Sequence, residues 1–430
     1  MPRRLDASAP DFAAAFAAVL DATRDTPEDV DAAVRAVLAA VRAEGDAAVS
    51  RFTAQFDHVA LTAAEFRVSA DEVAAAVAAC PADLLAALDL AAKRIEAFHQ
   101  RQRPADLGYT DSTGTKLAQV WRPIEAVGLY VPGGTAAYPS SVLMNALPAR
   151  VAEVPRIVMV TPPQGGTINP LVLAAASRAG VTEIYRIGGA QAVAALAFGT
   201  ETIQPVDKIV GPGNAYVAAA KRQVFGRVGI DSIAGPSEIL VVADAANNPR
   251  WIAADLLSQA EHDPSSQSIL ITDNKDFAAA VEAAVDDILT TLPRAAIAGA
   301  SWRDHGVVIT VPSLAAAIPL IDALAPEHLE LAVAEPEALA RGIRNAGAIF
   351  LGRYTPEAIG DYVAGPNHVL PTMRTARHTS GLGTVDFLKR TTMVHCTPDS
   401  LAAIGPAAVR LATAEGLDAH RLSVAVRLEG

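Results

Sequence analysis

The strongest constraint on the fold is a repeated alternation of short apolar runs with amphipathic segments. It begins near Val127, where AVGLYVPGG, RIVMVTPP, EIYRIGGA and DKIVGPGN are separated by longer stretches of helical periodicity. It resumes after Asp231 with EILVVAD, SILITD, GVVITV, HLELAV and AIFLG. Strands that alternate with helices in this way form parallel sheets covered by helices on both faces. We therefore predict an α/β protein with two successive open parallel sheets.

The segments on either side of this pattern differ from it. Residues 1–125 are predicted to be mostly helical, because Ala, Leu and Val recur three and four apart through 31–45 and 70–101. Towards the carboxyl end the strand pattern fades, and residues 371–430 are interpreted as a small appended unit with a helix around 402–415. A chain of 430 residues exceeds one ordinary core, so several packed units are expected.

Charge and cysteine usage exclude several classes of protein. The formal net charge of −12 argues against a nucleic-acid partner and favours a small-molecule ligand. Cys80 and Cys396 have no metal-type spacing and suggest no disulfide framework, which fits a reducing cytoplasm. Asp6 and Asp11 precede any apolar run that could serve as a signal peptide. The apolar stretch 307–321 contains two prolines and falls short of the ~20 residues of a membrane helix.

Glycine-rich turns close three strands of the first predicted sheet. They are Gly133-Gly134, Gly188-Gly189 and Gly211-Pro212-Gly213-Asn214, and each precedes a helix. Glycine lets the backbone approach a ligand, and the free N–H groups at a helix start attract anions such as a pyrophosphate. No G-x-G-x-x-G follows a strand, so the standard dinucleotide fingerprint is absent.

Three polar residues beside these turns have an ordinary structural interpretation as well as a functional one. Asn214 is suited to cap the helix NAYVAAAKRQVF. Tyr130, at a strand end, is typical of a half-buried packing residue. Gln191, just inside a helix, is typical of a solvated side chain. The residues alone leave both interpretations open.

The segment NNPRWIAADLLSQAEHDP is predicted to be a helix, with Asn248 as N-cap, Pro249 at the first position and Pro264 beyond its end. In its last turn Gln259 and His262 are three apart, so they share one face and are able to hold one ion or ligand together. The alternative is that His262 only complements the helix dipole.

Glu327 and His328 follow Ala325-Pro326 and lead into the predicted strand HLELAV. A carboxylate beside an imidazole supplies two groups that exchange protons near neutral pH. Loop ends are common places for such chemistry. The alternative is an exposed strand start, and the residues alone do not decide between the two.

Further polar residues lie towards the carboxyl end. Asp361, His368 and His378 belong to the glycine- and proline-rich loop IGDYVAGPNHVLPTMRTARHTSG, which we interpret as an active-site wall. Dispersed His and Asp residues are compatible with zinc, although their spacing defines no site. By composition, Glu415 and His420 would pass as part of a frayed surface helix.

Seven segments, in chain order, resemble the landmarks of the histidinol dehydrogenase family: YVPGG, GGAQAVAALAFGTE, VGPGNAYVAAAKRQV, IDSIAGPSEILVVAD, DLLSQAEHDPSSQSILIT, APEHLEL and GDYVAGPNHVLPT. The resemblance spans roughly residues 120–425, and residues 1–120 match only loosely. TTMVHCTPDS is not matched. The resemblance implies a homodimer with one Zn²⁺ per subunit. Its activity would be the oxidation of L-histidinol through L-histidinaldehyde to L-histidine with two NAD⁺, the final step of histidine biosynthesis.

The resemblance also implies residue roles. The catalytic residues would be Glu327 and His328, with His328 taking the alcohol proton and Glu327 activating water against the aldehyde. The zinc ligands would be Gln259, His262, Asp361 and His420, the last reaching the neighbouring subunit's site. The substrate contacts would be Ser237, Gln259, His262, His328, Asp361, Glu415 and His420. The NAD contacts would be Tyr130, Gln191 and Asn214.

On this basis the fold is expected to hold two Rossmann-like open parallel-sheet domains, a helical amino-terminal arm and a small carboxy-terminal unit. We place the arm at residues 1–25. The first α/β domain is discontinuous, from 26–128 with 239–370, and carries Glu327-His328 and zinc ligands. The second, at 129–238, contacts NAD, and residues 371–430 form the dimerisation unit.

Three other functions are compatible with parts of the sequence. A dehydrogenase with a cysteine nucleophile is disfavoured, because neither Cys80 nor Cys396 lies in a glycine-rich strand-end turn. A paralogue with the same machinery acting on another small alcohol, sulfonated or amino, remains open until substrates are compared. A non-catalytic two-lobed binding protein would share the paired α/β units but would not need the Glu327-His328 pair.

Overall fold

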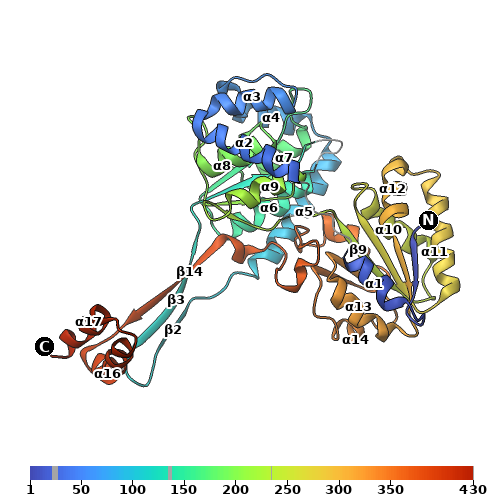
Figure 1. Cartoon of the computed structure of the whole chain (residues 1–430). Coiled ribbons are helices and arrows are strands. Elements are labelled where there is room, and N and C mark those ends of the chain that lie inside the picture. The colour runs from blue at the N-terminus through green and yellow to red at the C-terminus, as the bar shows by residue number, and fades with distance from the viewer. Residues whose placement is uncertain (22–27, 134–137, 234, 430) are drawn as a thin grey trace.

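The computed structural model describes residues 1–21, 28–133, 138–233 and 235–429. Figure 1 shows two α/β units side by side and a long arm that projects from them. One unit is built on a six-stranded sheet, the other on a five-stranded sheet, and the arm on a three-stranded sheet.

The six-stranded sheet has the order β1-β11-β10-β9-β12-β13, and every neighbouring pair is parallel. Alternate residues of its central strands face two separate cores, so both faces are covered. Its strands are β1 (Arg3–Asp6), β9 (Glu238–Ala243), β10 (Gln267–Thr272), β11 (Val307–Thr310), β12 (His328–Ala332) and β13 (Ala348–Leu351). One face is covered by α10 (Pro249–Ala260), α11 (Lys275–Leu289) and α12 (Ala295–His305). The other is covered by α1 (Phe12–Leu20), the 3₁₀ turn η2 (Leu314–Ala317), α13 (Ile318–Leu324) and α14 (Pro336–Ala340).

The five-stranded sheet has the order β6-β5-β4-β7-β8 and is also parallel throughout. Its strands are β4 (Ala126–Tyr130), β5 (Arg156–Val160), β6 (Glu183–Tyr185), β7 (Lys208–Val210) and β8 (Gly229–Ile230). One face is covered by α4 (Ala70–Ala79), α5 (Ala82–Gln100), α6 (Pro139–Val151) and α7 (Pro170–Ala179). The other is covered by α2 (Glu28–Glu44), α3 (Asp46–Phe56), η1 (Ala63–Glu65), α8 (Gly189–Phe198) and α9 (Ala215–Val224).

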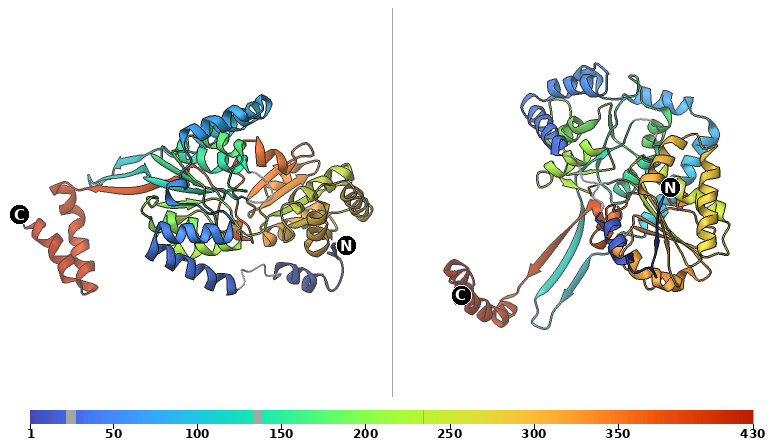
Figure 2. Two further views of the ribbon diagram at one scale, coloured as in Figure 1. Left: turned by 90° about the horizontal axis from the view of Figure 1, so that it is seen from above. Right: turned by 45° about the vertical axis from the view of Figure 1, so that its right-hand side comes forward.

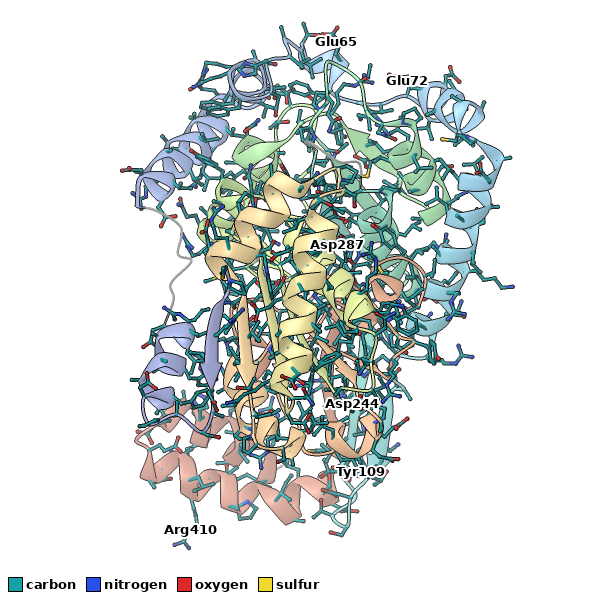
Figure 3. The ribbon with its side chains drawn as sticks, turned by 90° about the vertical axis from the view of Figure 1, so that its right-hand side faces the viewer. Glu65, Glu72, Tyr109, Asp244, Asp287 and Arg410 are labelled. Carbon is teal, nitrogen blue, oxygen red and sulfur yellow. The ribbon has the colours of Figure 1, made fainter. Side chains whose placement is uncertain are left out.

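The arm is an antiparallel sheet of order β14-β3-β2 that ends in two helices (Figures 1 and 2). Its elements are β2 (Leu107–Thr110), β3 (Lys116–Pro123), β14 (Leu388–His395), α16 (Pro398–Ala414) and α17 (Asp418–Leu428). In Figure 3, Tyr109 and Arg410 mark this arm, and Asp287 marks α11 of the six-stranded unit. The segment before β14 holds α15 (Glu357–Tyr362), η3 (Thr375–Arg377) and η4 (Thr384–Phe387).

No single helix in the described part of the chain is both long and apolar enough to cross a membrane. The pair α4 and α5 passes that test by length and composition only, with a bend of 113° between the helices. Their buried residues, among them Leu88 and Ile95, pack into the core of the five-stranded unit.

The predicted fold class is confirmed: both parallel sheets are present, and all nine predicted apolar runs are strands, β4 to β7 and β9 to β13. The prediction that residues 1–125 are mostly helical missed β1, β2 and β3.

The packing also differs from the predicted domain division. The strand in residues 1–25 pairs with β11, so this segment is not a separate helical arm. Helices α2 to α5, which were assigned with residues 239–370, cover the five-stranded sheet instead, because their apolar faces pack against β4, β5 and their helices. The carboxy-terminal unit includes β2 and β3 through pairing with β14.

Candidate functional site

A cavity of about 930 Å³ lies between the two α/β units. The five-stranded sheet contributes the carboxyl ends of its strands, where ligands of open α/β sheets usually bind. The six-stranded sheet contributes the amino ends of β9 and β12. Eight of the residues predicted from the sequence line this cavity: Tyr130, Asn214, Ser237, Gln259, His262, Glu327, His328 and Asp361.

The other three predicted residues lie elsewhere in the single chain. Gln191 is fully buried in the first turn of α8, and its Nε2 donates to Asp57 Oδ2 at 3.3 Å. Its interpretation as a solvated side chain is therefore wrong. Glu415, which follows α16, and His420, within α17, are exposed at the tip of the arm (Figure 1). Within one chain they do not reach the cavity.

Glu327 and His328 are both anchored on the backbone of Glu238 in the neighbouring strand β9. Glu327 Oε2 accepts from the Glu238 N–H at 2.9 Å, and His328 Nδ1 lies 3.0 Å from the Glu238 carbonyl oxygen. A carbonyl only accepts, so Nδ1 carries the proton and Nε2 is left as an acceptor. Both side chains are buried, and no described residue hydrogen-bonds to His328 Nε2. The interpretation of the pair as an exposed strand start is therefore wrong.

Burial shifts the two groups in opposite directions. It raises the pKa of Glu327 well above its ordinary value, which the Glu238 N–H partly opposes. It lowers the pKa of His328, which the nearby Glu357 carboxylate partly opposes. Because desolvation disfavours the charged form of each, a carboxyl and an imidazole are brought closer in proton affinity than in water. Groups matched in this way are suited to general acid-base chemistry.

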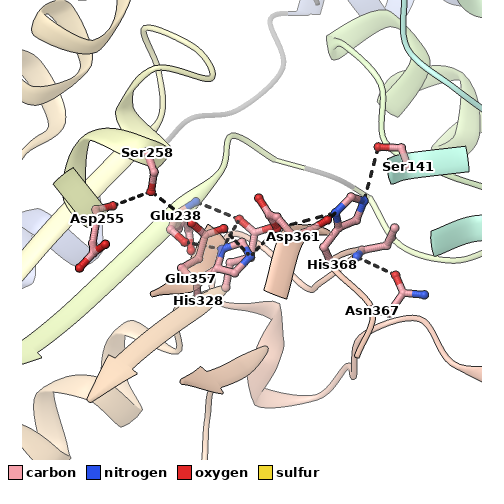
Figure 4. A network of polar contacts seen from close by, with 11 residues as sticks. Ser141, Glu238, Asp255, Ser258, His328, Glu357, Asp361, Asn367 and His368 are labelled. Carbon is pink, nitrogen blue, oxygen red and sulfur yellow. Dashed lines mark hydrogen bonds and ion pairs between the residues drawn. The ribbon is translucent and has the colours of Figure 1, made fainter. Parts of the chain in front are cut away.

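A cluster of possible metal ligands adjoins the pair. One ligand atom each of His328, Glu357 and Asp361 lies within 4.8 Å of the others. His328 Nε2 is 3.7 Å from Glu357 Oε1 and 3.9 Å from Asp361 Oδ1 (Figure 4). Burial raises the pKa of Glu357 to about 7 and that of Asp361 to about 6. A cation bound here would lower the pKa values of Glu357 and Asp361 and so favour their ionised forms.

The polar atoms around the cluster fit a bound metal ion. Gln259 Oε1, His328 Nε2 and Glu357 Oε1 are buried without a hydrogen-bond partner among the described residues. Such atoms are costly unless a ligand, water or ion satisfies them. Nitrogen and oxygen donors of this kind suit zinc. Of the predicted zinc ligands, Asp361 belongs to the cluster, and Gln259 and His262 line the same cavity.

The sequence analysis did not identify Glu357, a member of the cluster, and it placed the neighbouring His368 only in the active-site wall. Glu357 lies four residues before Asp361 on α15, a spacing that puts both on one helix face and could have pointed to it. His368 was assigned only to the wall. Its Nδ1 lies 3.0 Å from the Asp361 carbonyl oxygen and its Nε2 3.4 Å from Ser141 Oγ (Figure 4). Burial lowers the pKa of His368 to about 4.

A chain of acidic side chains continues behind the site. Ser258 Oγ donates to the Asp255 carbonyl oxygen at 2.7 Å and lies 3.2 Å from Glu357 Oε2. Glu330, on β12, shares a side-chain hydrogen bond with Asp255. Burial raises the pKa of Glu330 to about 9 and that of Asp255 to about 6. At least one of these two carboxyls therefore holds a proton at neutral pH.

The opposite wall is formed by the glycine-rich turns of the five-stranded sheet. Tyr130 Oη accepts from the Gly189 N–H at 3.0 Å, and burial raises the pKa of this phenol to about 12. Asn214 Oδ1 accepts from the N–H groups of Tyr216 and Val217 at 3.1 and 3.2 Å, so its predicted role as N-cap of α9 is confirmed. Both residues also face the cavity, so packing or capping does not exclude ligand contact.

Comparisons with known proteins agree with one another. The model of the family described as histidinol dehydrogenase matches residues 20–428. The histidinol dehydrogenase of Rhodospirillum rubrum is 66% identical over 429 residues, covering 100% of this chain and 99% of that protein. That of Rhodopseudomonas palustris is 63% identical over 428 residues, with the same coverage. The crystal structure of histidinol dehydrogenase from Elizabethkingia anophelis superposes with a TM-score of 0.94 at 39% identity, covering 100% of this chain and 98% of that one.

Proposed function

The chain belongs to the histidinol dehydrogenase family, and from that premise we propose how its residues carry out the reaction. The enzyme is an NAD-dependent oxidoreductase of the final step of histidine biosynthesis. It oxidises L-histidinol through L-histidinaldehyde to L-histidine and reduces two NAD⁺. The observation that carries the proposal is the buried pair Glu327 and His328, held on one peptide strand at the wall of the cavity.

In the first oxidation, His328 Nε2 takes the hydroxyl proton of histidinol, while the carbon that bears this hydroxyl transfers a hydride to NAD⁺. The tautomer fixed by the Glu238 carbonyl leaves the lone pair of Nε2 available for this proton. The lowered pKa of His328 keeps the imidazole neutral, and therefore basic, at neutral pH. The product is the aldehyde, which stays bound.

In the second oxidation, Glu327 takes a proton from water as the water attacks the aldehyde carbon. Once His328 has released the first proton to solvent, the resulting hydrate loses its hydroxyl proton to His328 and its hydride to a second NAD⁺, which gives the carboxylate of histidine. Glu327 must be ionised to act as a base, although burial raises its pKa. Positive charge bound in the cavity would lower that pKa.

We assign the zinc ligands as Gln259, His262 and Asp361, completed by His420 of the partner subunit. When bound, zinc would serve mainly as a template that orients the imidazole and amino groups of the substrate. The buried, unsatisfied Gln259 Oε1 and the exposed position of His420 support this assignment. Substrate contacts are assigned to Ser237, Gln259, His262, His328, Asp361 and, from the partner, Glu415 and His420.

We assign NAD to the wall formed by the five-stranded sheet. Tyr130 and Asn214 line the cavity there. Gln191, in the first turn of α8, does not line it. Gln191 Oε1 is buried without a hydrogen-bond partner in the described part of the chain, which supports a ligand contact after local adjustment.

The arm supports a homodimer with sites completed across subunits. Its strands and helices expose large apolar residues: Tyr109, Met393, Val394, Leu411, Leu422 and Val426. No residue of α17 is buried in the single chain. These exposed apolar side chains support an interaction site on the arm, and a second copy of the chain would bury them. The cysteine usage is consistent with the proposed cytoplasmic location.

The test is the yield of NADH per histidinol, measured before and after chelation of metal and again after zinc is restored. We expect two NADH per histidinol, loss of activity on chelation and recovery with zinc. One NADH per substrate would overturn the four-electron reaction. Full activity after complete metal removal would overturn the role of zinc. Parallel assays with other amino alcohols and sulfonated alcohols identify a paralogous substrate.

A further inference from the structure

An ion pair whose side chains are almost inaccessible lies beside the NAD wall of the cavity. Lys221, on α9, pairs with Asp231, which directly follows β8. Their side chains are only 3% and 4% exposed. The desolvation of two charges commonly cancels much of their mutual attraction, so a buried pair is weak evidence of a purely stabilising role.

Both members of the pair bind the same residue, Gly211. Lys221 Nζ donates to the Gly211 carbonyl oxygen at 2.9 Å. The Gly211 N–H donates to Asp231 Oδ2 at 2.7 Å. Gly211 directly follows β7, and so the pair ties together the carboxyl ends of β7 and β8 and the helix α9. We call this arrangement of Lys221, Asp231 and Gly211 the Gly211 clamp.

The clamp holds Gly211 in a position that only glycine tolerates. Its φ is +108°, and a Cβ built on it would overlap the Tyr130 carbonyl oxygen. The backbone of Gly211 therefore packs directly on Tyr130. Asn214 follows three residues later and caps α9. A shift of Gly211 would thus change the distance between the two side chains assigned to NAD.

Lys221 itself is not placed to bind a phosphate. Its ammonium is occupied by Asp231 and by the Gly211 carbonyl, and it does not line the cavity, whereas Asp231, Gly211 and Asn214 do. Its charge is balanced within the clamp. The lysine therefore acts on a ligand through the backbone turn and not by contact.

We propose that Lys221 and Asp231 are positioning residues for NAD. They hold the turn 211–214 against Tyr130, so that Tyr130 and Asn214 contact the same cofactor. The inference rests on the proposed function, in which NAD occupies this wall. Removal of the clamp weakens the binding of NAD and leaves the histidinol side of the cavity intact.

The test compares Lys221→Met with the double variant Lys221→Met/Asp231→Asn in the zinc-loaded enzyme. The readouts are the dissociation constant of NADH by fluorescence, the KM values of NAD⁺ and histidinol, and the melting temperature. For Lys221→Met we expect the NADH dissociation constant and the KM of NAD⁺ to rise on the order of 10-fold, with the KM of histidinol within about twofold of wild type.

The double variant tests the proposal even if the single variant does not fold. It removes both charges, so no unpaired charge remains in the interior. The amide introduced by Asp231→Asn retains an oxygen for the Gly211 N–H, so the melting temperature should recover. The KM of NAD⁺ should stay raised, because the Gly211 carbonyl still lacks its donor. A folded double variant with wild-type affinity for NADH overturns the proposal.

Lys208→Met is the matched control. Lys208 begins β7 at the opposite end of the strand, where it contacts Asp386, so the variant removes a similar lysine away from the turn. It should leave the KM of NAD⁺ unchanged, and an equal rise there would assign the effect to general destabilisation and overturn the clamp. A wild-type enzyme that binds no NADH overturns the proposed function instead.

Discussion

His328 Nδ1 lies 3.0 Å from the carbonyl oxygen of Glu238, a hydrogen bond between adjacent parallel strands that fixes the histidine tautomer. The same residue, Glu238, donates its N–H to the carboxylate of Glu327. One peptide segment of β9 thus orients both groups of the proposed catalytic pair, and His328 Nε2 faces the carboxylates of Glu357 and Asp361. The backbone of β9, more than the loop before β12, sets the geometry of Glu327 and His328.

Glu327→Gln separates the two oxidations. The glutamine keeps an oxygen for the Glu238 N–H, but it cannot take a proton from water. We expect oxidation of histidinaldehyde to fall about 10²-fold or more, while a single turnover of histidinol still gives one NADH. Rapid-mixing measurement of NADH from each substrate checks this. Equal weakening of histidinol and aldehyde binding, with the chemical steps unchanged, contradicts the role. Glu337→Gln, at an exposed position of α14, is the control.

Glu330 is expected to make the stability of the protein depend on pH. Its pKa is raised to about 9 in the fold by burial, whereas the unfolded chain has an ordinary value near 4.5. The folded state therefore binds the proton more tightly, and this contribution to stability is complete below about pH 4.5 and lost as pH rises towards 9.

Glu330→Gln removes the ionisable group and keeps a neutral side chain of similar shape. The melting temperature of the variant relative to wild type should be higher at pH 8.5 than at pH 5.5. Scanning calorimetry at both pH values measures the difference. A shift of the same size at both would show that the carboxyl of Glu330 does not titrate in this window.

Gly211 and Gly226 offer a matched pair of substitutions. Both have positive φ, +108° and +96°, but only at Gly211 would a Cβ meet the backbone of Tyr130, since nothing lies within 4 Å at Gly226. Gly226→Ala should cost about 1 kcal/mol of unfolding free energy from backbone strain alone. Gly211→Ala should cost more and raise the KM of NAD⁺. Denaturant unfolding compares them, and equal losses would exclude the contact with Tyr130 as a constraint.

Short sequence patterns correctly predicted the features that depend on neighbouring residues, such as helix caps and apolar strands. The start of α10 at Asn248 and Pro249, the cap at Asn214 and the apolar strand after Glu327 all follow from short-range rules, and all are present. The strand Arg3–Asp6 was not predictable in that way, because its charged residues give no strand pattern and it forms only by pairing with β11.

Long-range packing accounts for the other differences. The apolar stripes of α2 to α5 show that these helices cover a core but not which sheet they cover, and so they were assigned to the wrong unit. The solvated interpretation of Gln191 is wrong because its side chain is enclosed by Asp57 and the turn at Gly189, which lie far from it or form only in the folded chain. The burial of Glu357 and His368 likewise depends on segments distant in the chain, among them Ser258 and Ser141.

The position of His420 on the arm makes a prediction about mixed dimers. If each cavity takes His420 from the partner, a chain with Glu327→Gln and a chain with His420→Asn each lose most of the steady-state activity alone, but a dimer of the two contains one fully wild-type cavity. Random exchange gives half mixed dimers, so about one quarter of all cavities, and about one quarter of wild-type activity, should be recovered. Unfolding and refolding the two variants together, followed by the NADH assay, measures this. If His420 instead serves its own chain's cavity, every cavity in the mixture carries one defect and the activity stays at the level of the separate variants.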